Sequence, residues 1–249
     1  MMGRTIIGSA AQNKNLTSFV LDQGQNESGV GEAVQRREFK IRLADTEGRR
    51  SSASLLIQKM YAWRGYVTGK MPVNPTTTPS RITLVASNEQ GTLGTLSLGL
   101  DSPQGLLVDE MYKSEVDVLR GQGRKVCELT KLAVDTKQGS KWVLASLFHI
   151  AYVYGRQLNK VDDVFIEVNP RHELFYRRML GFERAGEQKI CERVNAPAVL
   201  LRLQLGFVDD QIELFGGKSD LGKTTVSLYP YFFSKKEEHG IRNRVEQLG

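Results

Sequence analysis

The stretch VDDVFIEVNPRHELFYRRMLGFE (residues 161–183) decides the fold of this sequence. Its first part is apolar and β-branched, as buried strands are, and PRHELFYRRML (170–180) predicts a helix with proline at its favoured first position. A strand over 125–135 and an apolar helix over 140–158 are expected before it, and a strand over 182–190 after it. This alternation of strands and helices predicts an α/β fold with parallel strand pairing.

The pattern extends outward from this stretch. FKIRLAD (39–45) alternates as a half-buried strand does, and the apolar runs at 81–87 and 91–100 predict a hairpin. The other expected elements are helices over 51–66 and 106–123 and a last strand over 194–205. Together they predict an α/β (α+β) domain, in which a mixed central sheet is flanked by helices.

The two ends of the chain differ from this middle part in composition. Residues 1–36 are rich in Gln, Asn, Gly and Ser and lack apolar periodicity, which predicts a flexible N-terminal arm. Residues 37–205 carry the expected domain. Residues 206–249 form a polar and aromatic C-terminal extension. Its charged end is the only part for which the sequence indicates a helix.

Composition limits the class of protein. A formal net charge of +6 favours an acidic partner without identifying it. Cys127 and Cys191 lie in strand-like segments and offer neither a disulfide framework nor a zinc spacing, so both are expected in the core and no metal is expected. The longest apolar stretch, 142–154, is too short to span a membrane, and the N-terminus lacks the pattern of a signal peptide. We therefore expect a cytoplasmic protein without a transmembrane segment.

Four residues of the stretch 161–183 follow one another in an order that recurs in a known superfamily. Asn169 ends the expected strand, Tyr176 follows seven residues later, and Gly181 and Phe182 follow the helix. In this order the chain resembles the GNAT superfamily of N-acyltransferases. The resemblance implies a GNAT-like mixed sheet flanked by helices.

A closer resemblance covers most of residues 39–183. FKIRLAD, the segment 102–135 and EVNPRHELFYRRMLGFE (167–183) are similar to N-acyl amino acid synthases of the FeeM type and, more distantly, to acyl-homoserine lactone synthases of the LuxI type. The lactone synthases carry an acidic and a basic residue three positions apart on the corresponding strand, which Glu128 and Lys131 match.

This resemblance implies an N-acyltransferase. It would move a long-chain acyl group from the phosphopantetheine arm of acyl carrier protein to the α-amino group of an amino acid, for which a tyrosine-like acceptor is one option. No further cofactor is implied, and the implied partners are acyl carrier protein and a small amino acid rather than nucleic acid. A lactone synthase that uses S-adenosylmethionine, and a non-catalytic protein that binds acyl carrier protein or its acyl chain, remain alternatives.

The reaction needs an acid and a base, for which two residues are candidates. Within the strand 125–135, alternation places Glu128 on one face with Val126, Thr130 and Leu132. Glu128 is a candidate base for the ammonium group, because partial burial raises a carboxyl pKa toward the useful range, and its alternative is a structural ion pair. Tyr176 is a candidate donor of the proton to the leaving thiolate, or otherwise a core residue.

Four further residues are candidates for binding the substrate. Arg42 or Lys131 would hold the carboxylate of the amino acid, although lysine lacks the bidentate fork of arginine. Asn169 matches the family pattern. His172 lies in the first turn of its helix, where the dipole favours the neutral ring, so it is a candidate site residue or an exposed helix-start histidine.

The expected donor follows from a missing motif. Acetyl-CoA enzymes place small residues where backbone amides hold the pyrophosphate, but this chain has QGSKWV (138–143) there. Side chains at these positions obstruct close approach, which favours a donor on a carrier protein over one on coenzyme A. The carrier is acidic, and the candidate docking residues are Arg36, Arg37, Arg49, Arg50, Arg124 and Lys141.

One motif is rejected. GKSDLGKT (217–224) satisfies the pattern of a phosphate-binding loop. The residues that follow are β-branched and reach Pro230 within six positions, so the helix that such a loop requires cannot form.

Overall fold

A computed structural model describes residues 6–12, 36–66, 80–135 and 141–246 of the chain. Its centre is one sheet with the strand order β1-β2-β3-β4-β5-β6-β9-β7, and β8 pairs with β9 beside this path. Only β5 and β6 pair in parallel, and the other pairs are antiparallel. The strands are β1 Ile7–Gln12, β2 Arg36–Leu43, β3 Arg81–Asn88, β4 Gly91–Leu100, β5 Val126–Val134, β6 Asp163–Val168, β7 Glu183–Arg184, β8 Lys189–Cys191 and β9 Ala196–Gln204.

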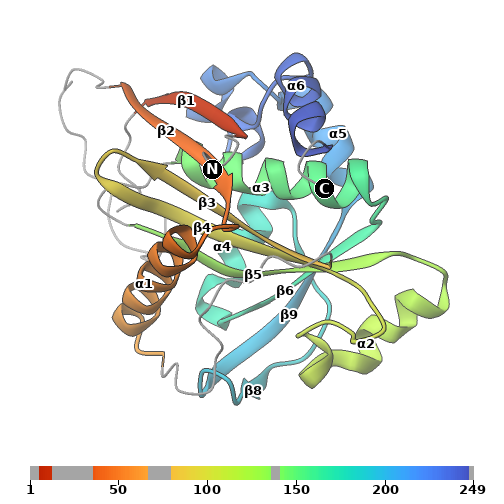
Figure 1. Ribbon diagram of the computed structural model, residues 1–249. Helices are drawn as coiled ribbons and strands as arrows, with labels where there is room; N and C mark the ends of the chain where they lie inside the picture. The colour runs from red at the N-terminus through yellow and green to blue at the C-terminus, as the bar shows by residue number, and fades with distance from the viewer. Residues whose placement is uncertain (1–5, 13–35, 67–79, 136–140, 247–249) are drawn as a thin grey trace.

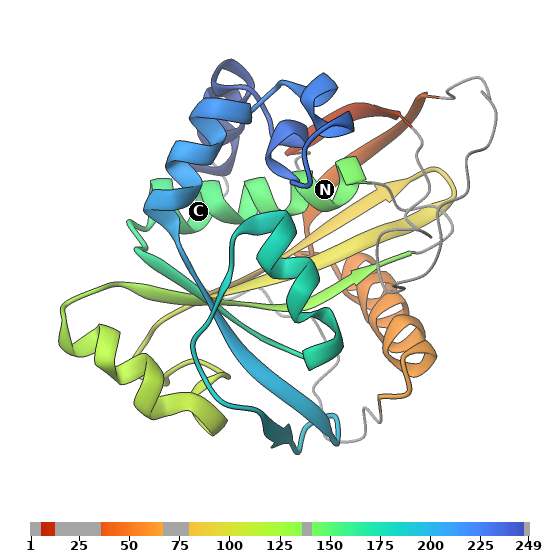
Figure 2. The same ribbon diagram turned by 180° about the vertical axis from the view of Figure 1, so that it is seen from behind.

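Helices cover both faces of the sheet (Figures 1 and 2). On one face lie α1 (Glu47–Trp63) and α2 (Asp109–Gly121), and on the other lie α3 (Lys141–Tyr152), its π-helical continuation η2 (Val153–Leu158), and α4 (Pro170–Leu180). Outside α3 follow the C-terminal elements α5 (Leu205–Phe215), η3 (Ser219–Lys223), η4 (Tyr229–Tyr231) and α6 (Lys235–Glu246). The expected mixed sheet flanked by helices is confirmed.

The period of the strands explains these two layers. Val126, Phe165 and Leu200 pack with α2, whereas their sequence neighbours Cys127 and Ile166 join the main core under α3. Since successive strand residues point to opposite faces, the apolar runs in β5, β6 and β9 serve both layers.

The helix α4 begins and ends as its sequence predicts. The side chain of Asn169 accepts a hydrogen bond from the Arg171 amide at 3.2 Å, and Pro170 occupies the first turn. Gly181 closes the helix in the left-handed conformation, with a φ of 81°. A β-carbon there would lie 2.4 Å from the ring of Phe207, so only glycine fits both the backbone and the packing.

The expectation of parallel pairing through three successive strands was only partly right. β5 and β6 are parallel neighbours, but β9 lies between β6 and β7 and pairs antiparallel with both. The expected strand 182–190 is divided into the short strands β7 and β8, which both pair with β9. The last strand of the domain therefore enters the sheet between elements that precede it in the chain.

Both chain ends also differ from the expectation. Residues 7–12, which were expected in a flexible arm, form the edge strand β1, paired with β2. Residues 13–35 lie outside the described part of the chain. The C-terminal extension contains a helix at its charged end, as expected, but it also contributes Val208, Tyr229, Phe232 and other residues to the main core. No α-helix begins directly after residues 217–224, since the next helical element is the short 3-10 helix η4, in agreement with the rejection of a phosphate-binding loop.

A bulge interrupts β5. Thr130 is paired with Ser97 and Ala133 with Thr95, so two residues of β5 oppose one residue of β4. Lys131 adopts a left-handed φ of 53°, and its carbonyl accepts a hydrogen bond from the Thr95 hydroxyl at 2.8 Å. The alternation shifts by one residue at this point, and the prediction that Leu132 shares the face of Val126 was wrong, because Leu132 packs against the main core.

β5 and β6 then separate. Their pairing covers only Val126–Glu128 against Asp163–Phe165, whereas the following residues of β6 continue to pair with β9. The sheet is therefore open between the second halves of β5 and β6. None of the described helices is long and apolar enough to cross a lipid bilayer.

Candidate active site

A cavity of about 150 Å³ lies where β5 and β6 separate. Residues 129–132 and 166–169 of the two strands line it. Helices of both faces contribute to the wall: α1 supplies Tyr61, Arg64 directly follows α1, and α4 supplies His172 and Tyr176. The cavity thus passes through the plane of the sheet.

Glu167 is a carboxylate on this cavity wall. One oxygen, Oε2, pairs with the Arg193 guanidinium, whereas Oε1 is buried and has no hydrogen-bond partner among the described residues. Burial raises the pKa of Glu167 to about 7, although Arg193 opposes the shift. A carboxylate with a free oxygen and a pKa near neutrality is suited to accept a proton from a bound substrate.

Three positively charged residues share the cavity wall with this carboxylate. Lys131, Arg64 and Arg193 line the same cavity, and the buried Nε of Arg64 has no hydrogen-bond partner in the described part of the chain. Burial, with a contribution from Arg81, lowers the pKa of Lys131 to about 8, so its ammonium is charged at neutral pH. The cavity is therefore suited to a ligand that carries both an amine and an anionic group.

Tyr176 and His172 lie on the α4 side of the cavity. Burial raises the pKa of Tyr176 to about 12, which keeps its phenol protonated and able to donate. Burial, Arg64 and Arg171 together lower the pKa of His172 to about 3. Its Nε2 accepts a hydrogen bond from Arg171 at 3.1 Å, so the ring is neutral and engaged within the protein.

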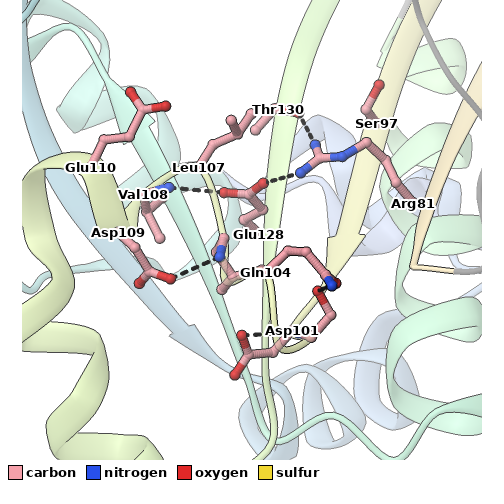
Figure 3. Close-up of polar contacts among 12 residues, drawn as sticks. Arg81, Ser97, Asp101, Gln104, Leu107, Val108, Asp109, Glu110, Glu128 and Thr130 are labelled. Atoms are coloured by element: carbon pink, nitrogen blue, oxygen red, sulfur yellow. Dashed lines mark hydrogen bonds and ion pairs between the residues drawn. The ribbon is translucent and has the colours of Figure 1, made fainter.

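Glu128 is completely buried beside the cavity (Figure 3). Its Oε1 lies 2.6 Å from Nη2 of Arg81, and its Oε2 accepts a hydrogen bond from the Val108 amide at 3.1 Å. Arg81 also donates to the Thr130 hydroxyl at 3.4 Å. Both carboxylate oxygens are therefore engaged, and Glu128 holds the loop that brings Leu107 and Val108 to the cavity wall.

Of the predicted substrate and catalytic residues, four line one cavity: Lys131, Asn169, His172 and Tyr176. The Asn169 side chain caps α4 and donates to the carbonyl of Pro197 at 3.1 Å. Glu128 and Arg42 are not on the cavity wall, and Arg42 lies on β2 opposite Val85. Binding of the carboxylate is thus a role that the geometry permits for Lys131 rather than for Arg42.

The predicted docking residues are distributed over several elements. Arg124 pairs with the buried Asp163, and Lys141 begins α3 with its ammonium 5.5 Å from the centre of the Tyr231 ring. Arg49 pairs with Asp45, and Arg50 donates to the carbonyl of Asp45 at 3.1 Å. The side chains of Arg36 and Arg37 and the residues 136–140 lie outside what the structure describes.

Sequence reasoning missed Glu167, Arg64 and Arg193. Glu167 carries the signal that singled out Glu128, a carboxylate within an apolar strand, and it lies two residues before Asn169. Arg64 directly follows α1, and no motif of the sequence marks it. Arg193 has no such signal, because its place depends on the pairing of β8 with β9.

The described residues contain no group of three or more His, Cys, Asp or Glu side chains that could hold a metal ion. The chemistry offered by the cavity wall is that of one carboxylate, protonated phenols and several cations. This set can remove a proton from an amine and bind an anion at the same time.

Comparison with known proteins agrees with this chemistry. The model of the family "N-acyl amino acid synthase FeeM" matches residues 52–204. The solved structure of FeeM, an N-acyl amino acid synthase from uncultured soil microbes, is 29% identical with a TM-score of 0.62, over 68% of this chain and 93% of that chain. No curated protein matches the chain.

Two other solved structures are more distantly similar. The acyl-homoserine lactone (AHL) synthase LasI is 14% identical with a TM-score of 0.49, over 68% of this chain and 91% of that one. An N-acetyltransferase from Staphylococcus aureus Mu50 is 13% identical with a TM-score of 0.46, over 67% and 97%. The mixed sheet with helices on both faces is thus similar to the fold of an N-acyl amino acid synthase.

Proposed function

The chain belongs to the N-acyl amino acid synthase FeeM family and is an acyltransferase, and from this premise we propose that it transfers an acyl group from acyl carrier protein to the α-amino group of an amino acid. The observation that carries the proposal is that Glu167, with one carboxylate oxygen that has no partner among the described residues, lines the same cavity as several cations. An amino acid presents the complementary groups, an ammonium and a carboxylate.

The proposed reaction begins with the amine. Glu167 takes a proton from the ammonium group, and the resulting neutral amine attacks the thioester carbonyl, which forms the C–N bond. The C–S bond then breaks, and the thiolate receives a proton from Tyr176, whose pKa near 12 makes it a protonated phenol at neutral pH. The attacking nitrogen loses its surplus proton as the amide forms, and this proton restores the phenol of Tyr176. The products are an N-acyl amino acid and the free thiol of the carrier.

The proposed acceptor site uses the cations. Lys131 is buried at the bulge of β5 and charged at neutral pH, and Arg64 has a buried nitrogen without a partner among the described residues. A carboxylate between them would gain charge-assisted hydrogen bonds and would direct the amine of the same molecule toward Glu167. A simple amine without a carboxylate lacks these contacts.

The proposed donor is supported by sequence rather than by geometry. QGSKWV (138–143) lacks the small residues that coenzyme A enzymes use for the pyrophosphate, and the net charge of +6 suits an acidic carrier. A carrier-bound acyl group needs only a passage for the phosphopantetheine arm.

Product analysis tests the proposal. The purified protein is incubated with the amino acids and with the same acyl group on either acyl carrier protein or coenzyme A, and the products are identified by mass spectrometry. We expect an N-acyl amino acid, formed faster from the carrier protein. Equal rates from coenzyme A would contradict the donor, a lactone formed only with S-adenosylmethionine would contradict the acceptor, and no transfer would contradict the function.

Two matched variants test the base. Glu167→Gln removes the proton acceptor at nearly constant volume, so kcat should fall by about a hundredfold or more while the unfolding temperature stays close to that of the wild type. Glu128→Gln breaks the buried pair with Arg81 and should lower the free energy of unfolding by about 1–3 kcal/mol. The opposite result, with loss of turnover only in a stable Glu128→Gln protein, would identify Glu128 as the base.

A further inference from the structure

A second cavity, of about 30 Å³, lies behind the candidate active site. The two cavities share Leu129 and Phe148, so they adjoin each other across these two side chains. Strands β4, β5, β6 and β9 and the helix pair α3–η2 form most of the second wall. Leu180 and Phe182 at the end of α4, Leu205 and Val208 of α5, and Tyr229 and Phe232 at η4 form the rest.

The second cavity presents carbon atoms rather than polar groups. The hydroxyl of Tyr229 donates to the carbonyl of Leu180 at 2.6 Å, and that of Tyr152 donates to Asp209 at 2.7 Å. Burial raises the pKa of Cys127 far above its ordinary range, so this side chain stays a neutral thiol. A hydrocarbon chain is the ligand that such a wall favours.

The aromatic end of this cavity is firmly fixed. The ring centres of Tyr229 and Phe232 lie 4.9 Å apart, and Phe232 stacks on His149 of α3 at 4.8 Å. The amide of Leu228 donates to the carbonyl of Met179 at 2.9 Å, which attaches this segment to α4. Both aromatic residues belong to the extension beyond residue 204, where the match to the family model ends.

We propose that Tyr229 and Phe232 form the end stop of an acyl pocket and thereby set the longest acyl chain that the protein transfers. This inference rests on the proposed function, because it gives the acyl tail of the thioester as the occupant. The cavity volume of about 30 Å³ is small, so the cavity accepts only the last carbon atoms of a chain that passes Leu129 and Phe148. Longer chains meet the two rings.

Two variants that change the cavity in opposite directions test the end stop. Phe232→Leu removes part of the stop and should move the preferred acyl chain to a longer one. Gly155→Ala adds a methyl group to the wall, where the nearest atoms would be Leu98 Cδ1 at 3.4 Å and Cys127 Sγ at 3.9 Å, so the protein should fold normally and prefer a shorter chain. Each methylene that gains or loses its apolar contact should change kcat/KM about fourfold, the equivalent of about 0.8 kcal/mol.

Phe233→Leu is the matched control. Phe233 is the next residue, is also buried and also stacks on His149, at 5.2 Å, but it does not line the second cavity. The substitution should reduce stability in the same way as Phe232→Leu and leave the preferred chain length unchanged.

The measurement is kcat/KM for a series of acyl carrier proteins whose acyl chains lengthen by two carbons at a time. Opposite shifts in Phe232→Leu and Gly155→Ala, with none in Phe233→Leu, would support the end stop. Transfer with the same preferred length in all variants would overturn it while leaving the proposed function intact. No transfer by the wild type at any chain length would instead contradict the proposed function.

Discussion

Glu128 and Glu167 lie on neighbouring parallel strands, yet their surroundings give them different chemistry. Glu128 has a partner for each oxygen, whereas Glu167 keeps one oxygen without a partner among the described residues and faces the cavity. A free, buried oxygen raises the proton affinity of the group, and the charge of Glu128 adds to the rise in the pKa of Glu167. Glu128 thus contributes to the basicity of Glu167.

The pH dependence of transfer should reflect Glu167 and Lys131. Glu167 must be ionised to accept a proton, so kcat/KM should fall as the pH drops below about 7. Lys131 loses its charge as the pH rises above about 8, so the KM for the amino acid should increase there. Rate profiles with pH should therefore be bell-shaped.

A variant separates the two limbs of this profile. In Lys131→Arg the cation stays charged at high pH, so the alkaline limb of the profile should move to higher pH while the acid limb stays near pH 7. An alkaline limb at the same pH in both proteins would exclude Lys131 as the carboxylate contact.

The sequence predicted part of the site at the scale of residues. Lys131, Asn169, His172 and Tyr176 were expected from motif and resemblance, and they line one cavity. The choice between two acids in apolar strands was not predictable, because it depends on Arg81 and Arg193, which reach these strands from elsewhere in the chain. The spacing of residues along the sequence does not show which distant side chains will pair with these acids.

At the scale of elements, the bulge in β5 determines where the site can form. The extra residue shifts the alternation, and it is Lys131 that takes the left-handed conformation there. A residue other than glycine in this conformation costs about 1 kcal/mol or more, which the surrounding structure must supply. The strain therefore coincides with a side chain that the proposed reaction uses.

Lys131→Gly should separate stability from function. Glycine relieves the strain of the left-handed conformation, and the substitution removes a buried ammonium. These two gains offset the larger loss of backbone entropy that glycine suffers on folding, so the unfolding temperature should stay unchanged or rise. The lost carboxylate contact should lower kcat/KM by about ten- to a hundredfold. Thermal unfolding and steady-state kinetics check both parts, and a strongly destabilised Lys131→Gly protein would show that the ammonium is needed for folding.

The elements themselves were largely predictable, since helices and strands with clear periodicity were found near the expected residues. The bulge and the place of β9 were not. Glycine usually marks a left-handed position in a bulge, but here lysine occupies it, so the sequence does not reveal the bulge. The insertion of β9 between β6 and β7 depends on pairing between strands that are distant in the sequence.

At the scale of the whole molecule, the C-terminal extension belongs to the main core. Its aromatic residues have no helical or strand period, which explains why the sequence indicated only a tail. The imidazole of His149 connects it to α3: Nδ1 accepts a hydrogen bond from the Phe233 amide at 2.9 Å, and Nε2 lies 2.7 Å from Oε2 of Glu238. Both ring nitrogens are used by the extension, so the neutral ring is required.

The stability of the protein should therefore decrease in acid. Burial lowers the pKa of His149 in the folded state, so the unfolded chain binds the proton more strongly once the pH falls below about 6.5. This one group should cost up to about 1.4 kcal/mol of unfolding free energy per pH unit below that value. Urea unfolding at several pH values should show this contribution in the wild type.

His149→Gln provides the comparison. His172 also has a lowered pKa and Glu167 a raised one, so the difference between the two proteins, rather than either curve alone, reports His149. The variant is expected to be less stable at neutral pH but to lose less stability on acidification. Parallel curves for the two proteins would contradict the requirement for a neutral ring.

The opening of the sheet between β5 and β6 also has a kinetic consequence. Because its wall draws on helices from both faces, we expect the two substrates to reach it from opposite faces of the sheet. Both can be bound at once, and no acyl-enzyme stage is needed between their arrivals. Double-reciprocal plots at several fixed concentrations of the second substrate should therefore intersect, whereas parallel lines would indicate that the first product leaves before the second substrate enters.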